Sequence, residues 1–345
     1  MLGYQTSPAS SPTAHRASAP RAPRAMALAA LSGDEQRILF TQLCNVLDPR
    51  LAVALSSVSF DLRTATQEGR QQLRTDHEVA AAFCLKVGLR SCKELHEAKR
   101  VDWCNKGLTT TDLGLLGTLG SVLPALEKSV LSDRSAAAGP DGVQQLAEGL
   151  GAGALPAVSD LQFIGMHVGD AGASELAAAL GRGALPRLEF LGLIDAAIGD
   201  TGLVALASAL RQRPALDGLN LAGNPFGDEG LAALVAPPLP AGALPPPAGG
   251  LAKLETLYLM RTQITDAGCA ALASALESGA LPALKGMIHL GGIPASAAAQ
   301  AAVQAVLHQR LPLYDEAGFY QCLQDDYGED VDSPGSDSED GGEYE

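Results

Sequence analysis

Aromatic side chains are scarce in this sequence, which has one tryptophan, six tyrosines and seven phenylalanines among 345 residues. Hydrophobic residues nevertheless make up 47% of the chain, so we expect a core of leucine, alanine and valine. Glycine and proline are plentiful, with 38 and 21 residues. That combination is typical of proteins whose short elements reverse direction often.

Motifs for catalysis are also missing. The sequence has no Walker motif, no G-x-S-x-G elbow and no H-E-x-x-H pair. Its six cysteines form no C-x-x-C pair and have no metal-ligand spacing, which favours reduced core thiols over a metal site or a disulfide framework. We therefore predict a protein that is not an enzyme and that uses no cofactor and no metal.

Basic residues are absent from the end of the chain. Twelve acidic residues and no Lys or Arg lie between Asp315 and Glu345, and they supply most of the net charge of −15. We expect the acidic segment 310–345 to be disordered on composition. The sequence lacks the basic face that nucleic-acid binding requires. It also lacks an apolar run of about 18 residues, which a membrane span requires. The sequence thus favours an intracellular protein, cytoplasmic or nuclear, with neither nucleic acid nor membrane as a partner.

A repeat organises the middle of the chain. Five glycines recur with steps of 30, 30, 28 and 38 residues, each followed four residues later by a leucine: Gly142, Gly172, Gly202, Gly230 and Gly268. This spacing predicts one apolar stripe on a short helix. Four aspartates precede these helices where an N-cap belongs, and we expect each to cap its own helix: Asp170, Asp200, Asp228 and Asp266.

A second pattern, L-x-x-L-x-L, lies upstream of each helix at strand spacing. Its anchors are Val158-Leu161-Phe163, Leu188-Leu191-Leu193, Leu216-Leu219-Leu221 and Leu254-Leu257-Leu259. The two patterns together predict one β-α unit per repeat, and so small a unit buries its apolar face only against its neighbours. The longer step contains the proline-rich insertion 236–250, which is either a passive bulge or a polyproline docking site.

The repeat LDGLNLAGNPFGDEGLAAL, residues 216–234, resembles the ribonuclease-inhibitor-like class of leucine-rich repeats. The resemblance covers residues 98–309 and implies an α/β fold, a leucine-rich-repeat solenoid of about seven repeats. In such a solenoid the parallel sheet lines the concave face and the helices cover the convex face. Asn224 stands at the asparagine position of the class, which implies that its side chain bonds the turn backbone. Other repeats have different residues at that position: Met166, Ala196 and Thr262.

The ends of the array depart from the repeat pattern. We expect an opening strand anchored by Val101 and Trp103, and a second unit in which Ser129 stands where leucine is expected. For the last strand, we prefer the register that places Leu290 inward and His289 outward. Departures of this kind are typical of the capping repeats of an array.

Residues 31–97 are predicted to form a small all-α domain, because the segment has helical periodicity and few prolines. One interpretation is a cap that shields the N-terminal edge of the repeats. Residues 1–30, rich in Ser, Ala, Pro and Arg, are a disordered N-terminus, a transit peptide or extra sequence ahead of a start at Met26.

The helical segment also resembles an F-box, in DE-x-x-x-LF-x-x-L from Asp34 and DPR-x-x-x-x-L-x-x-VS-x-x-LR from Asp48. Ser32-Gly33 replaces the proline usual in that family, and Leu62 stands where tryptophan is common. In F-box proteins such apolar side chains bind the Skp-type adaptor of a cullin–RING ubiquitin ligase, and the repeats that follow capture the substrate. The resemblance implies an adaptor-binding set of Leu39, Phe40, Leu43, Pro49, Leu55 and Val58.

The x positions of the strand pattern are expected to project onto the concave face. The central column reads Val130, Gln162, Gly192, Asn220, Tyr258 and His289. Aromatic and apolar residues beside it would point to solvent, and protein interfaces favour such residues together with arginine. We therefore predict a partner-binding surface, unless neighbouring loops cover it, formed by Phe190, Ile194, Tyr258, Met260 and Arg261.

Two alternatives remain at this point. The chain is a non-catalytic repeat scaffold without an adaptor, or it belongs to a different class of function. A repeat array with an acidic tail also resembles GTPase-activating proteins of the Ran type, which implies a catalytic arginine in an N-terminal repeat loop. Arg134 is the only plausible candidate for that position.

Overall fold

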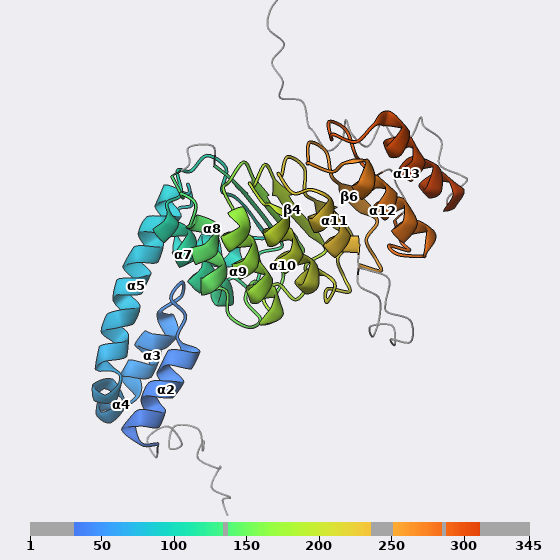
Figure 1. The fold of residues 1–345 in the computed structure, drawn as a ribbon. Helices are drawn as coiled ribbons and strands as arrows, with labels where there is room; N and C mark the ends of the chain where they lie inside the picture. The colour runs from blue at the N-terminus through green and yellow to red at the C-terminus, as the bar shows by residue number, and fades with distance from the viewer. Residues whose placement is uncertain (1–30, 134–136, 236–250, 285–287, 311–345) are drawn as a thin grey trace, which may run out of the picture. The chain divides into compact units, whose positions relative to one another are not determined.

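The structure is a computed structural model, and its described residues are 31–133, 137–235, 251–284 and 288–310 (Figure 1). They fall into two units that divide between Ala98 and Lys99. The predictions made for the N-terminal segment, the proline-rich insertion, the acidic segment and Arg134 all lie outside the described residues.

The described part of the first unit is helical. Its helices are α2 (Gly33–Leu43), α3 (Arg50–Val58), α4 (Phe60–Ala65), α5 (Gln67–Lys86) and α6 (Cys92–Glu97). Ser32 starts α2 with a capping box, because the Glu35 amide donates to its hydroxyl and the Glu35 carboxylate accepts from its amide. Phe40 packs into a buried cluster with Ala52 and Leu73.

The second unit contains one parallel sheet whose strands follow each other in chain order. They are β1 (Arg100–Asp102), β2 (Lys128–Ser132), β3 (Asp160–Ile164), β4 (Phe190–Ile194), β5 (Gly218–Asn220) and β6 (Thr256–Tyr258). The register pairs Gly192 with Asn220 and Asn220 with Tyr258, which confirms the predicted central column. Tyr258 forms a parallel bridge with His289, so the preferred register of the last strand is also confirmed.

A helix follows each strand, and the helices lie side by side on one face of the sheet (Figure 1). They are α7 (Thr110–Leu119) with the short 3-10 helix η1 (Gly120–Val122), α8 (Gly142–Gly149), α9 (Gly169–Gly181), α10 (Asp200–Leu210), α11 (Asp228–Val235), α12 (Asp266–Glu277) and α13 (Ala297–Arg310). The predicted leucine stripe is buried between helices and sheet, as Leu176, Leu206 and Leu272 show. Each fully buried leucine stabilises the unit by about 1.5–3 kcal/mol.

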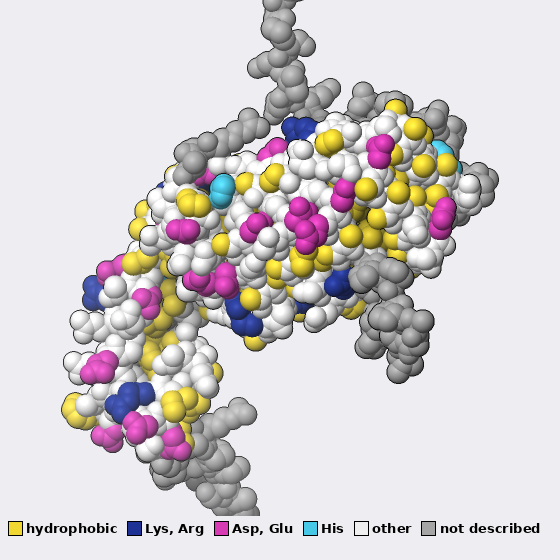
Figure 2. All heavy atoms as spheres, in the orientation of Figure 1, with side chains coloured by type: hydrophobic (Ala, Val, Ile, Leu, Met, Phe, Trp, Pro, Cys, Tyr) yellow, Lys and Arg dark blue, Asp and Glu magenta, His cyan; other side chains and the backbone are white. Residues whose placement is uncertain are grey.

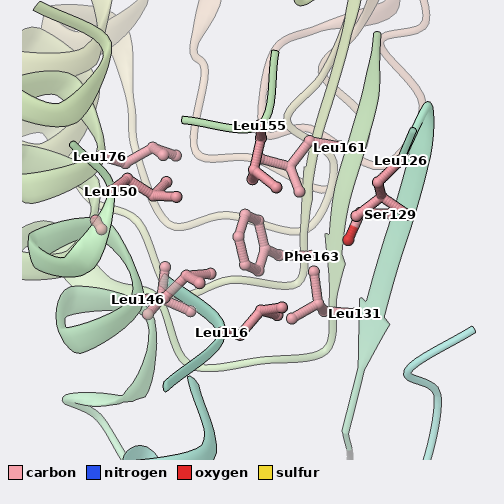
Figure 3. A pocket seen from close by; sticks show the side chains of 12 residues that line it. Leu116, Leu126, Ser129, Leu131, Leu146, Leu150, Leu155, Leu161, Phe163 and Leu176 are labelled. Atoms are coloured by element: carbon pink, nitrogen blue, oxygen red, sulfur yellow. The ribbon is translucent and has the colours of Figure 1, made fainter. Parts of the chain in front are cut away.

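Ser129 occupies an inward position that holds leucine or valine in the other strands. Its hydroxyl accepts a hydrogen bond from the Trp103 indole N–H at 3.0 Å, and both side chains are buried. Ser129, several leucines and Phe163 line a cavity of about 10 Å³ (Figure 3). That volume is about the size of one water molecule, so the cavity is a packing defect rather than a ligand site.

The aspartates at the helix starts cap the helix of the next repeat, so the prediction that each caps its own helix is wrong. The backbone N-cap of α10 is Gly199, and the Asp170 carboxylate accepts from the amides of Gly199 and Gly202 at 2.7 and 3.1 Å. Asp228 and Asp266 make the same contact with the repeat that follows each of them. Their carboxylates accept from the amides of Thr265 and Ser296, respectively. A carboxylate at a helix N-terminus complements the helix dipole, so this series ties neighbouring repeats together.

Arginines make the corresponding contact at the other ends of the helices. Arg182 donates to the carbonyls of Ala147 and Leu150 where α8 ends, and Arg213 donates to the carbonyl of Leu180 in α9. Burial lowers the pKa of Arg213. Cations are favoured near helix C-termini, so these arginines join neighbouring repeats at the helix ends opposite the aspartates.

The Asn224 side chain binds the backbone of two turns. Its Nδ2 donates to the carbonyls of Leu193 and Leu221 at 2.6 and 2.8 Å, and its Oδ1 accepts from the amides of Ala196 and Ile198. The expectation drawn from the repeat consensus is therefore confirmed. At the equivalent position Thr262 makes one such bond, to the carbonyl of Leu259.

Candidate functional site

Outward side chains of neighbouring strands line up in rows across the sheet. Alternate residues of a strand point to opposite faces, and the inward row of Leu191, Leu219 and Leu257 is fully buried. The opposite side, away from the helices, we call the strand face. Its outward residues on β3 to β6 and directly after β6 are Asp160, Gln162, Ile164, Phe190, Gly192, Ile194, Gly218, Asn220, Thr256, Tyr258 and Met260.

The predicted partner-binding residues all belong to β4 and β6 or to the turn after β6. Phe190, Ile194, Tyr258 and Met260 are half-buried, and Arg261 is exposed. Between them, β5 has small buried residues outward, Gly218 and Asn220. The larger apolar side chains therefore stand on both sides of a strand with little side-chain volume of its own.

The Phe190 ring packs against Gly218 of the neighbouring strand. A Cβ atom added to Gly218 would overlap the Cδ2 and Cε2 atoms of the Phe190 ring. Glycine at position 218 is thus required for the ring to occupy this place. The contact covers part of the ring and explains why an outward phenylalanine is only half-exposed.

Tyr258 and His289 form a stacked aromatic pair, with ring centroids 4.6 Å apart and an angle of 3° between the planes. Burial lowers the pKa of His289 below its ordinary value of 6.5, so the imidazole is neutral at pH 7. The pair adds a flat aromatic surface without a charge to the strand face.

Arg261 forms an ion pair with Asp195 at 3.2 Å. The pair passes over Gly223, whose φ is +72° and where a Cβ atom would overlap the Asp195 carboxylate. Both partners are largely exposed, so the pair itself contributes only about 0–1 kcal/mol. Its consequence is electrostatic, because Asp195 balances the charge that Arg261 brings to this edge.

Three carboxylates line the edge where β4 to β6 begin, and we call them the acidic row: Glu189, Asp217 and Glu255. The amide of Asp217 donates to the carbonyl of Glu189, and the amide of Glu255 donates to that of Asp217. Burial, and then the charges of Glu189 and Glu255, raise the pKa of Asp217. No motif in the sequence singles out this row, but each acid directly follows the first leucine of a strand pattern, so an alignment of the repeats locates it.

The side chains of the F-box-like set have different environments. Phe40 is 3% exposed and lies in the core of the first unit, so its own surface is not available to a partner. Leu43 and Val58 are 50% and 48% exposed. The remaining members are half-buried: Leu39, Pro49 and Leu55.

Exposed apolar side chains concentrate in the first unit. Among the described residues, the large hydrophobic side chains that are exposed there are Ile38, Leu43, Leu51, Val53, Val58, Phe60, Val79 and Leu85. In the second unit Val204 on α10 is the described example. Figure 2 shows acidic side chains spread over the helices of the second unit, with apolar side chains between them.

The described residues contain no group of three or more His, Cys, Asp or Glu that could hold a metal ion. Burial, and then Cys92, raise the pKa of the Cys84 thiol to about 12, so this thiol stays protonated at pH 7. Cys84 and Cys92 are free thiols, as the sequence predicts. Within the described part of the chain, no helix has the length and hydrophobicity needed to span a membrane.

A parallel sheet in chain order with one helix after each strand defines a repeat protein of the α/β class. A family model described as a leucine-rich repeat matches residues 219–235 and 250–273. These matches support a leucine-rich-repeat protein, and the six-stranded parallel sheet with its helices is compatible with that fold. No curated protein matches the chain. Leucine-rich repeats of this kind suggest a protein-binding role.

Proposed function

We propose that the second unit is a leucine-rich-repeat solenoid of the ribonuclease-inhibitor-like class, and that it binds a protein partner on its concave strand face without catalysing a reaction. The repeat length of 28–30 residues and the helix after each strand support this class. The contacts of aspartates and arginines with the helix ends of neighbouring repeats support a stiff array. A stiff array holds side chains from separate repeats in fixed relative positions, as recognition of a folded partner requires.

One observation carries the proposal. Phe190 and Ile194 on β4, with Tyr258 and Met260 at β6, keep part of their apolar surface in water on a face that the helices do not cover. Neighbouring strands are about 4.8 Å apart, so these two groups flank a strip of about 10 Å, wide enough for one segment of a partner. Tyr, Phe and Met are enriched at protein interfaces, and Tyr is also enriched among the residues that contribute most to the binding energy.

Affinity purification of the tagged full-length protein tests the proposal. A Tyr258→Ala/Met260→Ala variant should recover at least about tenfold less of its principal partner. Truncating each side chain that anchors an interface costs more than about 1 kcal/mol of binding free energy. The matched control is Val204→Ala, which removes an exposed apolar side chain from the helix side. Equal recovery of the partner by both variants would rule out the strand face as the binding site.

We propose a second interface on the first unit, an F-box-like surface that binds a Skp-type adaptor of a cullin–RING ubiquitin ligase. The number of exposed large apolar side chains in this unit supports it, because apolar surface left exposed in quantity commonly marks an interaction site. Leu43 and Val58 are the exposed members of the F-box-like set. Together, the two interfaces would make the protein a substrate-recognition adaptor.

A Leu43→Asp/Val58→Asp variant of the full-length protein separates the two interfaces. The adaptor and cullin should disappear from the purified complex, while the strand-face partner remains. Leu85→Asp, which changes an exposed leucine outside the set, is the control and should retain the adaptor. If the unaltered protein brings down no ligase component, the first unit has no adaptor role and the chain is a repeat scaffold.

A further inference from the structure

Three ion pairs balance charges of the strand face and its edges. Lys99 pairs with Glu127 at 2.9 Å, and Lys128 pairs with Asp160 at 2.5 Å. At the other edge, Asp195 balances Arg261. These three pairs lie along β1 to β3 and at the edge where the strands end.

The acidic row has charges of one sign only, those of Glu189, Asp217 and Glu255. Three carboxylates occur in three successive repeats, and Lys253 is the cation that lowers the pKa of the central Asp217. The outer two carboxylates raise that pKa, so their charges repel the charge of Asp217. A positive group placed against the row would relieve this repulsion, whereas a negative group would increase it.

The acidic row lies directly beside the apolar side chains of the strand face. Glu189 precedes Phe190 in the chain, and Asp217 precedes Gly218, against which the Phe190 ring packs. A ligand whose apolar group contacts Phe190 therefore places its next residues within reach of the carboxylates. The two features form one surface with an apolar centre and a negative edge.

We propose that this surface, formed by the acidic row with Phe190, Ile194, Tyr258 and Met260, binds a polypeptide segment of one chemistry. The segment has an aromatic or branched apolar side chain between β4 and β6, and lysines or arginines next to it that lie against the acidic row. This proposal rests on the proposed function of the strand face and adds the chemical class of the partner.

Charge complementarity also decides against an occupant from the same chain. The segment from Asp315 to Glu345 has twelve acidic residues and no Lys or Arg, so it has the same sign as the acidic row. An acidic segment would have to bring its carboxylates to an edge that already repels them. A basic segment of another protein meets the opposite condition.

The test is selection of random phage-displayed peptides on the full-length protein, followed by fluorescence polarisation with the enriched peptides. We expect peptides that combine an aromatic or branched apolar residue with at least two neighbouring Lys or Arg residues. Their affinity should fall at least about tenfold for Glu189→Lys/Asp217→Lys and fall further as salt is added, because the contact is between charges. Glu277→Lys, the same reversal on α12, is the control and should bind as the unaltered protein does.

Different failures point to different conclusions. Apolar peptides without basic residues, bound equally by the charge-reversal variant, would overturn this proposal and leave the strand face as a binding site. Peptides that bind a Phe190→Ala/Tyr258→Ala variant undiminished would overturn the proposed function as well, and so would the absence of any enriched peptide. Competition by a synthetic peptide of residues 325–345 would show that the acidic segment is the occupant and would also overturn the proposal.

Discussion

The Asp200 carboxylate, in the first turn of α10, accepts a hydrogen bond of 2.7 Å from the amide of Gly230 in α11. The same oxygen accepts from the amide of Gly227 at 2.9 Å. A Cβ atom at position 230 would lie 2.9 Å from that oxygen, so glycine there leaves room for the carboxylate. Three of the five recurring glycines therefore share one physical reason, which is the aspartate of the preceding repeat: Gly202, Gly230 and Gly268.

Replacing Asp200 by alanine tests this contact. The variant should lose about 1–2 kcal/mol of unfolding free energy, because two amides at the start of α11 lose their acceptor. Urea unfolding followed by circular dichroism measures the change. Glu229→Ala, an exposed acid in the first turn of α11 itself, should change stability by less than about 0.5 kcal/mol. Equal losses of unfolding free energy in the two variants would mean that the negative charge near the helix start stabilises the protein, and not the hydrogen bonds of Asp200.

The hydroxyl group of Ser129 should contribute more to stability than the volume of its side chain does. Ser129→Ala removes the acceptor of the buried Trp103 indole N–H and should cost about 1–3 kcal/mol. Ser129→Thr keeps the hydroxyl and adds a methyl group beside the cavity, so it should retain most of the stability. Trp103 is the only tryptophan, and its fluorescence therefore reports unfolding at this site. An unchanged urea midpoint for Ser129→Ala would contradict the account.

Asn224→Ala should loosen two turns at once. The substitution leaves the amides of Ala196 and Ile198 without their acceptor inside the protein, at an expected cost of about 2–4 kcal/mol. Hydrogen exchange should accelerate at these two amides, 26 and 28 residues away in sequence. Thr262→Ala, which removes one comparable bond, is the comparison and should cost less.

His289 should titrate below pH 6.5 in the folded protein, because burial lowers its pKa. Folding then disfavours the charged imidazole, so this histidine's contribution to stability is complete above about pH 6.5 and is lost as the pH falls toward the folded pKa. NMR titration of the imidazole measures this value. Tyr258→Ala removes the stacked ring and should move the pKa back toward 6.5. A His289 pKa at or above 6.5 in the unaltered protein would contradict the buried, neutral pair.

The sequence specified the sheet more completely than the site. The L-x-x-L-x-L anchors fix the inward rows, and a shift of one residue would turn Leu191 or Leu257 to solvent, so the register could be predicted. The helix that the Asp170 carboxylate caps could not be predicted. The spacing places Asp170 at a helix start but does not show which helix its carboxylate reaches. The Asp195–Arg261 pair joins residues 66 positions apart, and no local pattern marks it. The F-box-like motif places Phe40 in the adaptor-binding set by its position alone. Only its packing against Ala52 and Leu73 shows that the side chain is buried.

Site-specific photo-crosslinking of the full-length protein in cells is the most direct test of the central claim, which is recognition of a protein by the strand face. A photoreactive residue replaces Met260 on the strand face or, separately, Val204 on α10. We predict that position 260 crosslinks to a defined partner, that position 204 does not, and that Phe190→Ala suppresses the product. Crosslinks of equal yield from both positions, or from position 204 alone, would contradict the account.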